Sequence, residues 1–136
     1  MTHVLLVGGD VALLEGLAQS LAAQGHAPSV ATSLAEAREL ATIEPPLVLV
    51  VNRALASSAG AELLGIPLSA GGARLLYRAA TVPLAPLLPA LQRSVLADLT
   101  LPLERHRLSA LVHSLGERAR ATGRDLRPAP PDTRAL

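Results

Sequence analysis

The sequence contains no cysteine, no lysine, no phenylalanine and no tryptophan, and Tyr77 is its only aromatic residue. Without cysteine the chain can form no disulfide, no thiolate metal site and no cysteine nucleophile. One aromatic side chain cannot supply the stacking platforms on which single-stranded nucleic acids bind. The core must therefore be built from aliphatic side chains, and nucleic acid is disfavoured as a partner.

Long apolar runs are also absent. No stretch approaches the roughly 20 residues that a membrane-spanning helix needs. The first apolar stretch, residues 4–7, is short and follows no basic segment, which disfavours a signal peptide. We therefore expect a cytoplasmic protein that does not enter a membrane.

The chain has 136 residues, half of them apolar, and a formal net charge of +1. This length suits one domain with a single core. The charge is unevenly distributed, because residues 104–136 carry seven arginines and four acids. Acids and arginines are intermixed there, which is typical of a solvated helix face and tail rather than of a DNA-binding surface.

Short apolar runs alternate with segments of helical periodicity along the chain. Strands are predicted at residues 3–7, 27–31, 47–51, 73–79 and 95–99, and residues 4–7 and 47–51 are apolar throughout. Pro28 favours an edge position for the second strand. Helices are predicted at residues 11–24, 33–41, 57–64, 86–93 and 103–121. Ser33 and Glu36 match the capping box at the start of the second helix, and Asp10 stands where the cap of the first belongs.

Five strands that alternate with five helices predict an α/β three-layer sandwich around a parallel sheet, because parallel neighbours need crossover connections. Residues 1–121 form the predicted domain, and residues 122–136, rich in arginine and proline, are predicted to be a disordered tail. Such folds place their chemistry at the carboxyl ends of the strands. Here those ends are residues 8–9, 52, 78–80 and 100–101.

Three segments resemble the receiver domains of two-component response regulators, the CheY-like proteins with a flavodoxin-like fold. They are HVLLVGGD at residues 3–10, PPLVLVVN at residues 45–52 and DLTLPL at residues 98–103. The resemblance covers roughly residues 3–118. It implies a module of signal transduction and phosphorelay rather than an enzyme.

The family's site needs particular residue types at the ends of the strands. Two adjacent acids after the first strand help to hold Mg²⁺, which prefers carboxylate oxygens. An aspartate after the third strand accepts the phosphoryl group, and a serine or threonine and a lysine contact the phosphoryl oxygens.

This chain departs from the family pattern at each of these positions. Gly8 and Gly9 stand where the paired acids belong, and Asn52 stands at the phosphoacceptor position. Leu101 replaces the lysine, and Arg78 or its neighbour, depending on register, takes the place of the serine or threonine. The resemblance therefore implies a pseudo-receiver that binds no Mg²⁺, needs no cofactor and has no phosphorylation site.

A partner surface is predicted near the last strand and helix, a face that receiver domains commonly use for dimerisation or partner binding. Its candidate residues are Asp98, Arg105, Arg107 and Arg118. The resemblance thus implies phosphorylation-independent contact with another signalling protein or a second copy of the chain.

The alternative is a small-anion or nucleotide-binding module at the carboxyl end of the sheet, where the two glycines precede a helix. The G-x-G-x-x-G spacing of dinucleotide-binding proteins is absent. The four histidines form no ligand set with metal-binding spacing, so no metal site is predicted.

Overall fold

Five short strands form one parallel sheet in the computed structural model, which describes residues 2–84 and 86–126. The strands are β1 (His3–Val7), β2 (Ala27–Ala31), β3 (Val48–Asn52), β4 (Ala73–Arg78) and β5 (Val95–Thr100). Their order is β2-β1-β3-β4-β5, with every neighbouring pair parallel. The predicted parallel α/β sheet and the edge position of the second strand are confirmed.

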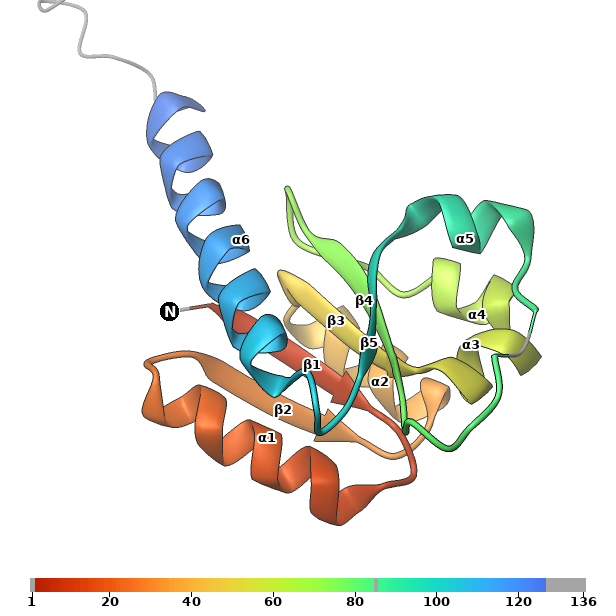
Figure 1. The fold of residues 1–136 in the computed structure, drawn as a ribbon. Coiled ribbons are helices and arrows are strands. Elements are labelled where there is room, and N and C mark those ends of the chain that lie inside the picture. The colour runs from red at the N-terminus through yellow and green to blue at the C-terminus, as the bar shows by residue number, and fades with distance from the viewer. Residues whose placement is uncertain (1, 85, 127–136) are drawn as a thin grey trace, which may run out of the picture.

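Helices cover both faces of this sheet. They are α1 (Val11–Ala23), α2 (Leu34–Ile43), α3 (Arg53–Ser58), α4 (Gly60–Leu64), α5 (Pro89–Ser94) and α6 (Arg105–Leu126). Helices α1 and α6 lie on one face and α2 to α5 lie on the other (Figure 1). Among the described residues, no helix combines the length and the apolar character that crossing a membrane requires.

Two aliphatic cores result from the alternation of side chains along the strands. In β1, Val4 and Leu6 pack toward α1 and α6, whereas Leu5 and Val7 pack toward α2 to α5. Successive side chains of a strand point to opposite faces, so a strand covered on both faces must be apolar throughout. This explains why β1 and β3 read as continuous apolar runs.

The prediction of a single helix at residues 57–64 is wrong. Helix α3 begins directly after β3, because the side-chain oxygen of Asn52 accepts the Ala54 N–H at 2.8 Å, and α4 follows as a separate short helix. Helix α5 begins at Pro89 rather than at residue 86. A proline fits the first helical turn, where no amide hydrogen is needed.

The last helix is longer than predicted, since α6 ends at Leu126 rather than near residue 121. The start of the predicted tail therefore continues α6, and residues 127–136 lie outside the described residues.

The Ser33 cap is confirmed, because its hydroxyl accepts the Glu36 N–H at 3.1 Å. The Glu36 carboxylate accepts a hydrogen bond from the Thr32 hydroxyl at 3.2 Å, so only half of the capping box forms.

Candidate functional site

The carboxyl ends of β1, β3 and β4 meet at one edge of the sheet, as the strand order requires. A cavity of about 170 Å³ lies there. It is lined by Asp10, Asn52, Arg53, Ala54, Arg78, Ala79, Val82 and Pro83. The structure therefore brings together two of the positions predicted from the sequence, Asn52 and Arg78, and adds Asp10 and Arg53 to them.

Tyr77 fills the space beside this cavity. Its side chain is 1% exposed, and it lies next to Asn52 in the β3–β4 register. A β-carbon placed on Gly8 would overlap the Tyr77 hydroxyl and would come within 3.3 Å of the Asn52 β-carbon. The volume that any side chain at position 8 would need is thus occupied by the phenol.

Gly9 is in a different situation from Gly8. Gly9 is exposed, and nothing lies within 4 Å of a β-carbon built on it. Of the two glycines at the predicted metal position, only Gly8 is required by packing. Asp10 follows them at the N-cap position of α1, but its carboxylate makes no capping hydrogen bond. The predicted capping role of the Asp10 side chain is therefore wrong, and Asp10 lines the cavity instead.

The Tyr77 hydroxyl makes no hydrogen bond to the described residues. Burial raises the pKa of Tyr77 above its usual value of 10.0, the nearby Asn52 side chain lowers it, and the negative charge of Asp10 raises it. The net direction is upward, so the phenol stays neutral. A neutral phenol oxygen is a weaker ligand for a divalent cation than a carboxylate.

Two further positions of the predicted site have structural roles. Asn52 uses its side-chain oxygen to cap α3. Leu101 is 1% exposed and belongs to the core between the sheet and α1 and α6. A buried leucine has no charge with which to contact a phosphoryl oxygen.

Arg78 lines the cavity at the end of β4. Its guanidinium donates to the carbonyl oxygens of Ala79 at 3.4 Å and Val82 at 3.1 Å. These bonds hold the side chain over the loop after β4 and leave part of it exposed. Arg78 therefore places a positive charge at the edge where the strands end.

An ion pair between Arg53 and Asp98 joins the end of β3 to β5 across the intervening β4. The Arg53 and Asp98 side chains are 15% and 32% exposed, so the pair is partly screened from water. Sequence reasoning missed it because the two residues are 45 positions apart. Asp98, predicted as part of a partner surface, is engaged in this internal contact.

The predicted partner surface is divided in the structure. Arg107 forms an exposed ion pair with Glu104 at 3.1 Å. Arg105 lines a groove between α1 and α6. Because successive residues of an α-helix are about 100° apart, Arg107 and Arg118 share one side of α6, and Arg105 faces nearly the opposite way.

Within the described residues, no group of three or more histidine or acidic side chains could hold a metal ion.

Glu104 connects the end of β5 to the first turn of α6 through hydrogen bonds. Its carboxylate accepts the Thr100 N–H at 2.7 Å and the Arg107 guanidinium at 3.1 Å. These hydrogen bonds, that of Thr100 first, lower the pKa of Glu104 below its usual value of 4.5. The protein therefore gains stability that is fully present above that usual value and is lost as the pH falls through the lowered pKa.

We expect Glu104→Gln to remove this pH-dependent contribution. Urea unfolding of the wild type and the variant across the acidic range measures it. The difference in free energy of unfolding should shrink as the pH falls, whereas Glu15→Gln, at an exposed site on α1, should leave the profile unchanged. A difference that does not vary with pH would contradict the assigned role of Glu104.

Comparison with solved structures identifies the fold. The chain is similar to a two-component response regulator from Clostridium difficile, with a TM-score of 0.71, 17% identity, and coverage of 88% of this chain and 98% of that one. It is similar to a CheY-like response regulator receiver domain protein from Methanospirillum hungatei, with a TM-score of 0.69, 18% identity, and coverage of 85% and 98%. For a receiver domain protein from Clostridium thermocellum the TM-score is 0.67, the identity 13%, and the coverage 90% and 99%.

This chain therefore has the fold of response-regulator receiver domains, as predicted. No model of a known protein family matches it, and no curated protein matches it by sequence. At this level of identity the agreement is one of architecture.

Proposed function

We propose that the chain is a receiver domain of two-component signalling that acts without phosphorylation, as a protein-interaction or dimerisation module. The observation that carries this proposal is the position of Tyr77, whose buried phenol occupies the space that a side chain at Gly8 would need. Asn52 and Leu101 support it, because one caps a helix and the other packs in the core.

The residues of this site also bear on its response to Mg²⁺. A cluster of neighbouring carboxylates without a metal repels itself, and a bound divalent cation relieves that repulsion. Among the described residues, Asp10 is the single acid that lines the cavity, so these residues hold no such repulsion to relieve. We expect the melting temperature of this protein to be insensitive to millimolar Mg²⁺.

The direct test is exposure to Mg²⁺ with beryllofluoride, which mimics an acyl phosphate, followed by amide NMR. No shifts are expected at Gly8, Gly9 or Asn52, and intact mass after treatment with acetyl phosphate should be unchanged. A phosphorylatable receiver domain treated in parallel shows that the reagents are active. Saturable shifts around Gly8 and Asn52 would refute the proposal.

A second candidate function is the binding of a small anion in the cavity. Arg78 lines it together with Arg53, whose charge is paired with Asp98, and Asp10 is the single acid among the described lining residues, so Arg78 is the cation that an anion would meet. Its volume of about 170 Å³ is below the roughly 300–1,000 Å³ of pockets for organic ligands, so inorganic phosphate suits it better than a nucleotide. Phosphate added without Mg²⁺ should then shift the amides near Arg78, and Arg78→Gln should abolish the effect.

The interaction role predicts a contact on the exposed side of α6 that carries Arg107 and Arg118. Sedimentation of the wild type and of an Arg107→Glu/Arg118→Glu variant tests the homodimer form of the proposal. A dimer that the variant dissociates supports it. A wild-type monomer at all concentrations rejects the homodimer and leaves contact with another signalling protein, for which the same variant serves as the control in a pull-down.

A further inference from the structure

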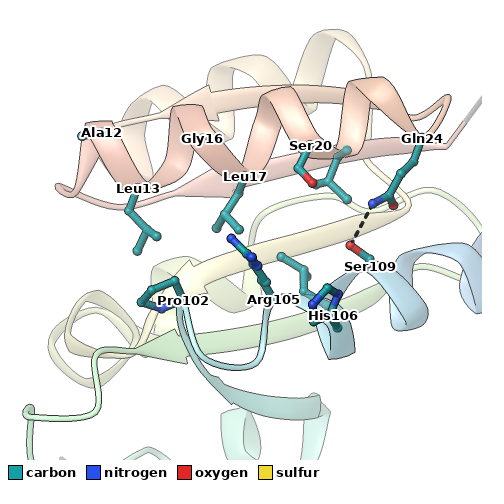
Figure 2. Close-up of a pocket in the computed structure, with 12 residues that line it drawn as sticks. Ala12, Leu13, Gly16, Leu17, Ser20, Gln24, Pro102, Arg105, His106 and Ser109 are labelled. Carbon is teal, nitrogen blue, oxygen red and sulfur yellow. Dashed lines mark hydrogen bonds between the residues drawn. The ribbon is translucent and has the colours of Figure 1, made fainter.

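A groove of about 530 Å³ lies between α1 and α6, on the opposite side of the sheet from α2 to α5 (Figure 2). Its buried floor is aliphatic and consists of Leu17, Leu21 and Leu108. The remaining lining residues are Ala12, Leu13, Gly16, Ser20, Gln24, Pro102, Arg105, His106 and Ser109. The volume falls within the range of pockets that hold small organic molecules.

Polar groups are found at defined places in this groove. Arg105 and His106 enter it from α6, and Figure 2 shows Arg105 extending toward α1. The Gln24 side-chain amide donates to the Ser109 hydroxyl at 3.3 Å and bridges the two helices. No carboxylate of the described residues lines the groove, and no ion pair joins Arg105 to another of them. Within the described part of the chain, the groove therefore has a positive charge without a compensating acid.

Gly16 keeps the wall of the groove open. No atom lies within 4 Å of a β-carbon built at this position in the middle of α1. A glycine inside a helix is unfavourable relative to alanine, and here no packing contact requires it. The consequence of the glycine is free space along α1 between Leu13 and Leu17. The lining residues within α1 extend from Ala12 to Leu21, about 14 Å along the helix axis.

We propose that this groove binds an elongated apolar organic anion, such as a medium-chain carboxylate. The anionic group pairs with Arg105, which holds the uncompensated charge. The apolar chain lies along α1 in the space left by Gly16, over the floor formed by Leu17 and Leu108. This site is separate from the carboxyl end of the sheet and does not depend on the absence of phosphorylation there.

Decanoate, below its micellar concentration, is the probe. Decyltrimethylammonium carries a chain of the same length with the opposite charge, and acetate carries the same head group without the chain. Amide NMR of the full chain should show saturable decanoate-dependent shifts at Leu13, Gly16 and Ser109. The same concentrations of the other two compounds should leave these amides unshifted. Equal shifts with the ammonium compound, or no shifts with decanoate, would overturn the proposal.

Two pairs of variants locate the ligand. Arg105→Gln should weaken decanoate binding about tenfold or more, because it removes a charge-assisted hydrogen bond. Arg107→Gln, on the other side of α6, should not weaken it. Unchanged affinity in Arg105→Gln would refute the role of the arginine.

Gly16→Leu should abolish binding by filling the open space, whereas Gln19→Leu adds the same side chain to α1 outside the groove and should leave affinity unchanged. Circular dichroism confirms that both variants fold. If Gly16→Leu does not fold, Gly16→Ala is the smaller change, and it should weaken binding while adding helix propensity. Full decanoate affinity in a folded Gly16 variant would place the ligand elsewhere.

Discussion

Gly8→Asp, which introduces an acid at the position where the family resemblance predicts one, will destabilise this protein by about 3 kcal/mol. The β-carbon alone would overlap the Tyr77 hydroxyl, and the phenol is held in the core with 1% exposure. Tyr77 can yield only by displacing packed neighbours. The new carboxylate would also lie near Asp10. Urea unfolding gives the change in free energy. It is followed by circular dichroism, because the chain has no tryptophan to serve as a fluorescent probe.

Smaller, uncharged substitutions separate the steric overlap between position 8 and Tyr77 from the effect of the new negative charge. Gly8→Ala should cost about 2 kcal/mol in the wild type. Tyr77→Phe should be close to neutral alone, because it removes a buried hydroxyl that has no hydrogen-bond partner among the described residues. In the Tyr77→Phe background the cost of Gly8→Ala should fall by about 1 kcal/mol or more. If the free-energy effects of Gly8→Ala and Tyr77→Phe simply add, the Tyr77 hydroxyl is not what excludes a side chain at position 8.

Gly9→Ala is the matched control for this series. Gly9 adjoins Gly8, but a β-carbon there meets nothing within 4 Å. We expect its effect on stability to stay within about 0.5 kcal/mol. A loss at Gly9 as large as that at Gly8 would indicate a backbone requirement common to both glycines instead of the contact with Tyr77.

Asp98→Ala will destabilise the protein by about 2 kcal/mol, since it removes the carboxylate that pairs with Arg53. Losing one partner of a fully buried ion pair costs about 3–5 kcal/mol, and an exposed pair contributes about 0–1 kcal/mol. Arg53 and Asp98 are 15% and 32% exposed, so an intermediate value is expected. Thermal or urea unfolding measures the loss.

Glu117→Ala provides the exposed comparison, because the Glu117–Arg120 pair is about half exposed on both sides. Its cost should be below about 1 kcal/mol. An Arg53→Met/Asp98→Leu double variant should recover most of the stability lost in Asp98→Ala, because apolar groups of similar size can replace a buried ion pair. Equal costs for Asp98→Ala and Glu117→Ala would mean that the link from β3 to β5 contributes no more than a surface pair.

The sequence was sufficient to predict the fold class. The runs at residues 4–7 and 47–51 are apolar throughout, and a strand must be so when both of its faces are covered. Helical segments between the runs then require a parallel sheet. Local chemistry also predicted the Ser33 cap, which depends only on residues three apart.

Helix boundaries near proline and at strand ends were predicted less well. The helix predicted from residue 86 begins instead at Pro89, which fits the first helical turn. Asn52 was considered only as a replacement for an acid, and its capping of α3 moved the start of that helix to Arg53. In both cases the residue type fits more than one position. Proline can break a helix or begin one, and asparagine can end a strand or cap the next helix. The packing of the segment decides between these positions.

The sequence by itself determined which chemical groups are missing from the carboxyl end of the sheet: Gly8, Asn52 and Leu101 cannot supply carboxylates or a lysine. Only the tertiary structure decided what takes their place. Tyr77 meets Gly8, and Arg53 meets Asp98, because the order of the strands brings together residues far apart in the chain. Local propensity is determined by near neighbours, whereas such contacts depend on strand order, register and the direction of each side chain.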